Sequence, residues 1–357
     1  MAILGKPAVY DTAGFSSRKS PVYNTGTSNR RRADAVHIEI VGGGAIGLWV
    51  AANLASAGES VRLWTRTERQ SLLIKDAGIL LRDTAGSGRT VYLPCERMGG
   101  HSYTALESGD TEECLIILAV KQTAIQDELI QQLQLLTRIY RHTSILCLQN
   151  GIGHLEKLAA GLGDVPIYAA VTTMGAKRED ERTVRLAGAG ELWIGERAEN
   201  DPVFDEKRAK SQKKFLLSLQ KAGFQPFLSN EINNRIFHKL LINAVINPLT
   251  ALFDVTNGEL PKQERRVHIM RALHNETLDI LKRAGMQDPG DSWEGVLEVC
   301  ARTSANISSM LADVRGGRET EIRAINGAVA ELAAAHGLKA PMNEAVTAIV
   351  ESFEGMQ

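Results

Sequence analysis

A glycine cluster between an apolar run and an apolar-faced helical segment constrains the fold of this chain more than any other feature. It lies in residues 36–69, VHIEIVGGGAIGLWVAANLASAGESVRLWTRTER, which read as a strand, a tight turn, a helix and a second strand ending near Thr65. In that context Gly42, Gly44 and Gly47 match the G-x-G-x-x-G fingerprint of a dinucleotide-binding loop. The cluster therefore predicts the first strand and helix of a nucleotide-binding sheet.

Each glycine of the fingerprint has its own role. The first permits the tight turn, the second lets a pyrophosphate approach the backbone, and the third lets the helix pack close to the sheet. Because the positive end of the helix then faces the phosphates, we expect the whole loop to line the cofactor: Gly42, Gly43, Gly44, Ala45, Ile46 and Gly47. The alternative is a glycine turn with only a packing role.

The residue after the second strand indicates which dinucleotide binds. An acidic residue there accepts a hydrogen bond from the ribose 2′-hydroxyl of NAD, whereas an arginine pairs with the 2′-phosphate of NADP. This chain has Arg66 at that position and Arg69 as a second candidate, which favours NADPH. Glu68 lies between them, and a solvated surface arginine without a ligand is the other interpretation of Arg66.

The pattern after the first unit predicts an α/β sheet. Short buried strands at 114–120, 144–149 and 167–175 alternate with helical segments, which indicates a mainly parallel, doubly wound arrangement. Two other stretches read as antiparallel hairpins, one turning at 86–88 and one at 188–190.

From about Glu231 onward the strand patterns give way to helical ones ended by glycines. We therefore expect three regions: a disordered tail over 1–35, a Rossmann-type domain over 36–229 and an all-helical domain over 230–357. The tail is rich in Ser, Thr, Gly and Arg and has no periodicity. An organellar transit peptide is the other interpretation of it, supported by Arg30–Arg32 but opposed by Pro7 and Pro21.

The bulk composition excludes several classes of protein. With 44% hydrophobic and 23% charged residues the chain is an ordinary soluble, globular protein, and we expect it in the cytoplasm. A net charge of -1 provides no broad field to attract nucleic acid or an anionic membrane, and no apolar run approaches the roughly 20 residues of a membrane span. The four cysteines form no C-x-x-C pair and the eight histidines lie singly, so we expect reduced thiols and no metal.

A polar stripe in the segment 238–260 needs a binding partner. Lys239, Asn243 and Asn247 recur every four residues in an otherwise apolar helical pattern, so their side chains share one narrow face. Burying such groups without partners costs roughly 1 to 3 kcal/mol each. The partner is either a ligand or a neighbouring helix.

The chain resembles the 2-dehydropantoate 2-reductase family, also called ketopantoate reductases, over essentially all of residues 36–357. The resemblance rests on GGGAIG, VKQ, LQNGIG, KLLINAVINPLTAL with TNGEL, and SSMLADVRGGRETE. It implies a Rossmann-type domain followed by an all-helical domain of the 6-phosphogluconate dehydrogenase C-terminal-like type. It also implies NADPH-dependent reduction of a 2-oxo acid, ketopantoate, to pantoate on the route to pantothenate and coenzyme A.

The resemblance assigns roles residue by residue. Lys239 matches the catalytic lysine and Glu321 the glutamate of the active cleft, which also meets the cofactor. The substrate-binding positions are Asn150, Asn243, Asn247, Asn257 and Ser309, and further cofactor positions are Lys121, Asn150 and Ala176. The chain departs from the family at Ala124, where many members have a glutamine.

Some interpretations stay open at this level. Asn150 with Gly151 is also a turn signal, and Ser309 could be only a helix cap. A related reductase of another small 2-oxo acid, and a non-catalytic NADPH-binding sensor, are the competing functions. A homodimer is compatible with the resemblance.

Overall fold

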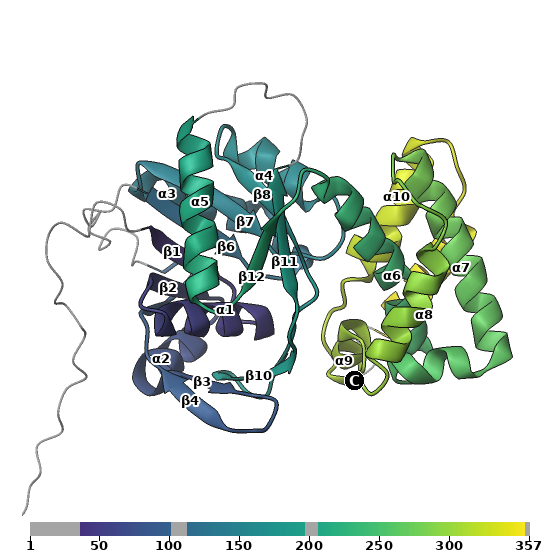
Figure 1. Ribbon diagram of the computed structural model, residues 1–357, viewed down its shortest axis with the longest axis horizontal. Helices are drawn as coiled ribbons and strands as arrows, with labels where there is room; N and C mark the ends of the chain where they lie inside the picture. The colour runs from purple at the N-terminus through teal and green to yellow at the C-terminus, as the bar shows by residue number, and fades with distance from the viewer. Residues whose placement is uncertain (1–35, 101–112, 197–205, 354–357) are drawn as a thin grey trace, which may run out of the picture.

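A computed structural model describes residues 36–100, 113–196 and 206–353 of the chain, and for residues 206–209 it describes the backbone alone. Figure 1 shows an α/β part, which ends at Leu228, and a helical part, which begins at Ile232. The predicted tail over 1–35, and with it the transit-peptide alternative, lies outside the described residues.

The main sheet of the α/β part consists of β1 (His37–Val41), β2 (Ser60–Thr65), β5 (Cys95–Arg97), β6 (Glu113–Leu118), β7 (His142–Cys147), β8 (Ile167–Thr172), β11 (Glu191–Glu196) and β12 (Gln225–Leu228). Their order is β12-β11-β8-β7-β6-β1-β2-β5, and all neighbours are parallel except β11 and β8. β1 pairs with β2 on one side and with β6 on the other. The strand order therefore reverses at β1, which is where doubly wound sheets bind their ligands.

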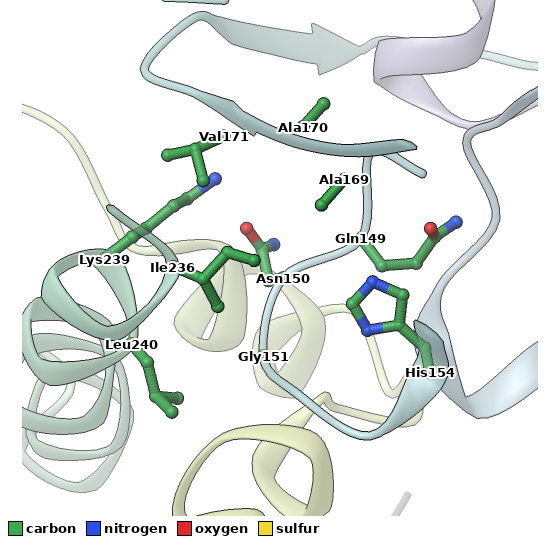
Figure 2. Close-up of a pocket in the computed structure, with 10 residues that line it drawn as sticks. All are labelled: Gln149, Asn150, Gly151, His154, Ala169, Ala170, Val171, Ile236, Lys239 and Leu240. Carbon is green, nitrogen blue, oxygen red and sulfur yellow. The ribbon is translucent and has the colours of Figure 1, made fainter. Parts of the chain in front are cut away.

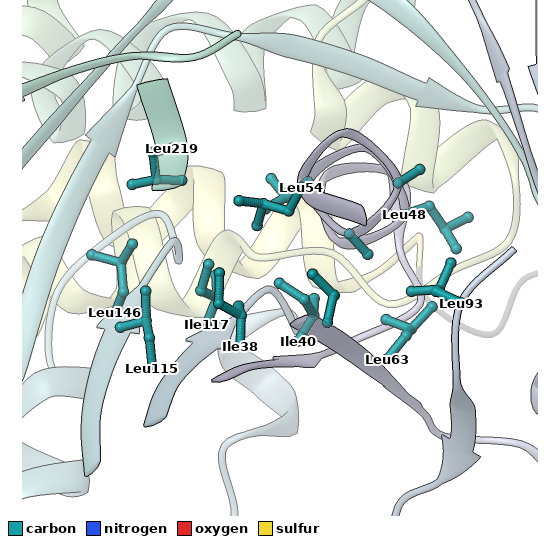
Figure 3. Packing of buried hydrophobic residues seen from close by; sticks show 14 of the residues in the cluster. Ile38, Ile40, Leu48, Leu54, Leu63, Leu93, Leu115, Ile117, Leu146 and Leu219 are labelled. Atoms are coloured by element: carbon teal, nitrogen blue, oxygen red, sulfur yellow. The ribbon is translucent and has the colours of Figure 1, made fainter. Parts of the chain in front are cut away.

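Helices cover both faces of this sheet: α1 (Ala45–Ser56), α2 (Glu68–Ala77), α3 (Asp127–Ile139), α4 (His154–Leu162) and α5 (Glu206–Lys221). Alternate residues of a strand point to opposite faces, so Ile38 and Ile40 pack with Leu54 of α1 in one core, which Figure 3 shows. Val41 and Ile116 pack with α3 and α4 on the other face. Both faces of the main sheet are therefore buried under helices, as the predicted doubly wound arrangement requires.

A second, smaller sheet consists of β3 (Ile79–Arg82), β4 (Gly88–Val91), β9 (Gly175–Arg178) and β10 (Thr183–Gly188) in the order β4-β3-β10-β9. The predicted hairpin that turns at 86–88 is present as the antiparallel pair of β3 and β4. The predicted hairpin that turns at 188–190 is wrong. There β10 leaves the small sheet and β11 joins the main one, so the two strands do not pair with each other.

The actual reversal lies at Asp180. Its Oδ1 accepts hydrogen bonds from the main-chain N–H groups of Arg182 (2.8 Å) and Thr183 (2.7 Å), which closes the turn between β9 and β10. Gly190 instead lies where two backbones meet, since a Cβ on it would come within 2.4 Å of the Met174 nitrogen. The glycines at 188–190 thus mark a strand that changes sheets, a pattern that resembles a turn in sequence.

The helical part consists of α6 (Ile232–Phe253), η3 (Asn257–Lys262), α7 (Glu264–Arg283), α8 (Ser292–Arg302), α9 (Ser309–Arg315), the π turn η4 (Arg323–Gly327), α10 (Ala328–Ala335) and α11 (Pro341–Glu351). Its described residues contain no strand, as the sequence predicted. α6 lies between two apolar clusters, one with α9, α10 and α11 and the other with η3, α7 and α8. It is therefore the central helix of this part.

By length and hydropathy alone, α6 is also the one helix of the described residues that could cross a membrane. Just over half of its most apolar window, 56%, is buried inside the protein. A core helix passes the same test of length and hydropathy, and the two apolar clusters around α6 account for its composition.

Candidate active site

The glycine loop between β1 and α1 contains two glycines that the protein itself requires. Gly42 has φ 125°, and a Cβ there would lie 2.7 Å from the carbonyl carbon of Ala119. A Cβ on Gly47 would lie 1.8 Å from the Gly42 oxygen. These two positions allow the turn and the close approach of α1, the roles expected of the first and third fingerprint glycines.

Gly44 differs because the fold does not demand it. The nearest atom to a Cβ on Gly44 would be the Ala119 oxygen, at 3.9 Å. Gly44 is the N-cap of α1 and offers no side-chain cap, and Ala45 and Ile46 follow it partly exposed. The first N–H groups of a helix lack partners within the helix, so this open end suits a phosphate group. The loop therefore fits a dinucleotide.

The remaining loop residue, Gly43, is hydrogen-bonded by two side chains from outside the loop. Its carbonyl oxygen accepts hydrogen bonds from Gln70 Nε2 (2.8 Å) and from Arg178 Nη1 (3.1 Å). A Cβ on Gly43 would lie 2.5 Å from Gln70 Oε1. The buried Gln70 thus fixes the loop conformation from the start of α2.

The two arginines after β2 have different surroundings. Arg66 directly follows the strand, is exposed, and forms no ion pair with any residue that the structure describes. Arg69 pairs with Glu181 at 3.0 Å. Arg66 is therefore the cation available for a ligand, while the charge of Arg69 is already engaged.

The carboxyl ends of the parallel strands bring the other predicted groups to one edge of the sheet. Lys121 follows β6, Asn150 follows β7 and Thr172 ends β8. α6 passes this edge and presents Lys239, whose Nζ donates a hydrogen bond to the main-chain oxygen of Thr172 at 2.9 Å. This arrangement places the lysine where ligands of doubly wound folds bind.

Lys239 lies in the wall of a cavity between α6 and the sheet (Figure 2). The cavity is lined by Gln149, Asn150, Gly151, His154, Ala169, Ala170, Val171, Ile236, Lys239 and Leu240. Burial lowers the pKa of the Lys239 ammonium from its ordinary value of 10.5 to about 8, and the nearby Glu321 carboxylate opposes this change. The lysine can therefore give up a proton near neutral pH.

Glu321 comes from the helical part and is held by the α/β part. Its Oε1 accepts a hydrogen bond from the Gln122 main-chain N–H, and its Oε2 accepts one from Asn150 Nδ2, both at 3.2 Å. Only Ile322 separates it from the π turn η4, a type of irregularity that is frequent at functional sites. Asn150 is thus more than a turn residue, because its amide reaches across to the helical part.

Beyond Lys239, the polar stripe of α6 has no hydrogen-bond partner among the described residues. Neither the Asn243 amide nor the Asn247 amide forms a hydrogen bond with any described residue, although only 7% of Asn247 is exposed. The buried amides elsewhere in this part behave differently, since Asn326 Nδ2 donates to the Ala244 oxygen at 2.9 Å and to Asn343 Oδ1 at 2.9 Å. The hypothesis that the stripe binds a neighbouring helix therefore has no support here.

Asn257 and Ser309 flank the same helix. Asn257 is buried and donates through Nδ2 to Thr303 Oγ1 at 2.9 Å, while its Oδ1 has no partner among the described residues. Ser309 is the exposed first residue of α9. The cap of α9 is Ser308, whose Oγ accepts from the Leu311 N–H at 3.0 Å, so Ser309 is not needed as a helix cap.

Lys121 follows β6 of the main sheet, and Ala176 lies on β9 of the smaller sheet. Lys121 Nζ pairs with Asp313 Oδ2 at 2.8 Å and donates to the Glu319 oxygen, both in the helical part. Ala176 is half-buried on β9 beside α1. Ala124, where the chain departs from the family pattern, is exposed in the short turn η2 (Gln122–Ala124).

Sequence reasoning missed three participants: Gln122, Thr172 and Asp313. Thr172 acts through a main-chain oxygen, which leaves no signal in a sequence. Gln122 stands next to the predicted Lys121, but nothing in VKQ indicates that its N–H binds a carboxylate.

No cluster of three or more metal-ligating side chains occurs in the part of the chain that the structure describes. The four cysteines are all buried and free.

Comparison with known proteins identifies relatives that match both the α/β part and the helical part. The family model described as Ketopantoate reductase PanE/ApbA matches residues 38–199, and the model described as Ketopantoate reductase PanE/ApbA C terminal matches residues 231–354. The 2-dehydropantoate 2-reductase of Bacillus subtilis is 32% identical over 322 residues, which cover 89% of this chain and 97% of the relative. That of Archaeoglobus fulgidus is 28% identical over 318 residues, covering 89% and 97%.

Solved structures agree with these relatives in fold. The crystal structure of the probable 2-dehydropantoate 2-reductase from Bacillus subtilis superposes with a TM-score of 0.72 at 30% identity, covering 89% of this chain and all of that one. The structure of D-mandelate dehydrogenase with NADH and anilino(oxo)acetate superposes with a TM-score of 0.75 at 26% identity, covering 89% and 98%.

Proposed function

Since the chain belongs to the ketopantoate reductase PanE/ApbA family, we propose that it reduces 2-dehydropantoate to pantoate with NADPH as the reductant. The family is one of oxidoreductases that use a nicotinamide dinucleotide. The observation that carries the proposal is Lys239, an ammonium of lowered pKa in the wall of a cavity where the strand ends meet α6.

Reduction of a ketone builds negative charge on the carbonyl oxygen, so the site must supply a proton to that oxygen. When bound, the reduced nicotinamide supplies the hydride to the carbonyl carbon. Lys239 holds the proton at Nζ and passes it to the oxygen, after which solvent returns a proton to the amine. Burial makes the ammonium a stronger acid, and Glu321 keeps it charged until the reaction begins.

The remaining groups bind and orient the acid. Asn243 and Asn247 lie one and two turns along α6 from Lys239, and their amides are free of partners among the described residues. With Asn150, Asn257 and Ser309 they offer the donors and acceptors that a carboxylate and a hydroxyl of the substrate require. The buried Oδ1 of Asn257 has no partner among the described residues. An amide oxygen can only accept a hydrogen bond, so a substrate hydroxyl would suit it as the donor.

One feature supports the choice of NADPH. Arg66 stands directly after β2 without an ion pair to a described residue, and an arginine there matches a 2′-phosphate. Lys121, Asn150 and Glu321, at the carboxyl edge of β6 and β7, and Ala176, on β9 beside α1, would meet the rest of the cofactor. We place the reaction in the cytoplasm, in keeping with the family's role in making pantothenate.

The second candidate is a reductase of a different small 2-oxo acid that uses NADH. The D-mandelate dehydrogenase structure favours it, because that enzyme holds NADH and an oxoacetate derivative in the same fold. A sensor that has lost its chemistry has less support, since it would not need a lysine of lowered pKa beside a carboxylate.

An assay of reduced-cofactor oxidation separates these candidates. The purified protein is given NADPH or NADH with 2-dehydropantoate, its analogue without the terminal hydroxyl, pyruvate or phenylglyoxylate. We expect the highest kcat/KM for 2-dehydropantoate with NADPH. A higher kcat/KM for phenylglyoxylate, or for NADH, would assign the protein to the second candidate, and no oxidation with any acid would favour the sensor.

A further inference from the structure

Glu321 is the carboxylate that opposes the lowering of the Lys239 pKa, yet no described residue of the helical part donates a hydrogen bond to it. Both of its oxygens are bound from the α/β part. Oε1 accepts from the Gln122 N–H and Oε2 from Asn150 Nδ2. The position of this charge therefore depends on two loops, the one after β6 and the one after β7.

The Gln122 side chain connects those two loops. Its Nε2 donates to the Ile152 oxygen at 2.6 Å, and Ile152 lies two residues after Asn150. A carbonyl oxygen can only accept a hydrogen bond, so the amide nitrogen must face Ile152 and the orientation of the amide is set. Gln122 thus supplies one donor to Glu321 with its own N–H, and its side chain holds the loop that carries the other donor, Asn150.

The loop after β7 also contacts the helical part directly. Gly151 has φ 82°, and a Cβ there would lie 2.1 Å from the Ala324 oxygen in the π turn after Glu321. The backbones of 150–152 and of η4 are therefore in contact. A loop that is released from Gln122 would shift against this turn and carry the Asn150 amide away from Glu321.

We propose that Gln122 is a positioning residue for the reaction. Its main-chain N–H binds Glu321, its side chain holds the loop that carries Asn150, and together these two bonds keep Glu321 beside Lys239. The proposal rests on the proposed function only in giving Lys239 the role of proton donor. The bonds among Gln122, Glu321 and the loop after β7 do not depend on which acid is the substrate.

The charged groups near Lys239 set the sign of the expected effect. Glu321 raises the pKa of the ammonium, the Thr172 oxygen accepts its hydrogen bond, and His154 lies in the wall of the same cavity. Lys121, next to Gln122, is paired with Asp313. If Glu321 moves away, its stabilisation of the charged amine weakens, and the pKa of Lys239 falls further below 8.

The test measures that pKa without turnover. The full chain, free of substrate and cofactor, is labelled by competitive acetylation across a pH series, and mass spectrometry follows Lys239. The proteins are wild type, Gln122→Met, Glu321→Gln and the double variant. Gln122→Met keeps the length of the side chain and removes its donor. Gln126→Met is the control, because the Gln126 side chain donates to the Thr123 oxygen and accepts from Lys157 Nζ, and bonds neither Glu321 nor residues 150–152.

We expect Gln122→Met to lower the pKa of Lys239 by roughly 0.5 to 1 unit, the effect of moving one charge by about an ångström in a partly dehydrated site. Glu321→Gln should lower it at least as much, and the double variant should match Glu321→Gln. Gln126→Met should match wild type. If Gln122→Met fails to fold, Gln122→Asn, which is one methylene too short to reach Ile152, takes its place.

Two results would overturn the proposal: an unchanged pKa of Lys239 in the Gln122 variant, or the same additional shift when Glu321 is already glutamine. Because the labelling needs no substrate, a wild-type protein that does not reduce 2-dehydropantoate would contradict the proposed function and leave this test unaffected. Where turnover can be measured, kcat should fall in Gln122→Met and stay near the wild-type value in Gln126→Met.

Discussion

Lys239 of α6 and Thr172 of β8 are joined by a hydrogen bond of 2.9 Å from the lysine Nζ to the threonine main-chain oxygen. The bond links the helical part to the carboxyl edge of the sheet. A carbonyl oxygen is a neutral acceptor, so it orients the amine and, unlike a carboxylate, adds no full negative charge. The lysine is therefore held in place while burial still keeps its pKa near 8.

The glycine loop provides a matched pair of substitutions. Gly44→Ala should fold with nearly normal stability, because the nearest atom to its new methyl group is 3.9 Å away, and should lose most of its affinity for the dinucleotide. Gly47→Ala should instead be strongly destabilised, since its methyl group would lie 1.8 Å from the Gly42 oxygen. Thermal unfolding and fluorescence titration with NADPH check both. Normal NADPH binding by folded Gly44→Ala would show that the phosphates lie elsewhere.

The choice of cofactor is tested at the end of β2. Arg66→Glu should weaken NADPH far more than NADH, because a carboxylate would face the 2′-phosphate. Arg69→Glu is the comparison: Arg69 already pairs with Glu181, so its replacement should affect the two cofactors alike. Isothermal titration of each variant with both cofactors makes the distinction. An equal loss for NADPH and NADH in Arg66→Glu would remove the arginine from cofactor selection.

The stability of the protein should respond to Lys239 in a pH-dependent way. Below pH 8 the amine is protonated in both the folded and unfolded states, so the folded state bears the cost of a buried charge. Between about 8 and 10.5 the unfolded state binds more protons, and the free energy of unfolding should rise with pH.

Lys239→Met should therefore be more stable than wild type at pH 7, by roughly 1 kcal/mol after the lost bond to Thr172 is subtracted. The gain should shrink as the pH rises above 8 and reverse in sign before pH 10.5, because wild type recovers the cost of the buried charge over that range. Chemical denaturation at a series of pH values measures it, and Lys339→Met, at an exposed lysine, should show no such trend. A Lys239→Met variant that is less stable than wild type at pH 7 would mean that the ammonium stabilises the fold.

The sequence predicted the layers of the fold well, because they depend on periodicity and glycine placement. It failed at 188–190, where glycines that let β10 pass into β11 resemble a turn, while the true turn rests on Asp180. It also could not predict contacts made by main-chain atoms. The Thr172 oxygen and the Gln122 N–H bind Lys239 and Glu321, and neither leaves a mark on residue type.

The activity should also depend on pH with a definite sign. Lys239 must be protonated to donate, so kcat/KM for the 2-oxo acid should be constant at neutral pH and fall as the pH rises through about 8. In Glu321→Gln the fall should begin at lower pH, because the carboxylate that raises the lysine pKa is gone. A pH profile of kcat/KM for the two proteins tests this. A profile that rises through pH 8 would require a deprotonated lysine and a different mechanism.

The last prediction separates chemistry from binding on the polar stripe. If Lys239 neutralises charge that develops only during hydride transfer, Lys239→Ala should reduce kcat by roughly 10² to 10⁴-fold and leave NADPH affinity nearly unchanged. Asn243→Ala, one turn along the same face, removes an amide that has no partner among the described residues and should mainly raise KM for the acid. Steady-state kinetics, with folding checked by circular dichroism, distinguish the two patterns. A Lys239→Ala variant that keeps more than about a third of wild-type turnover would exclude the lysine from the proton transfer.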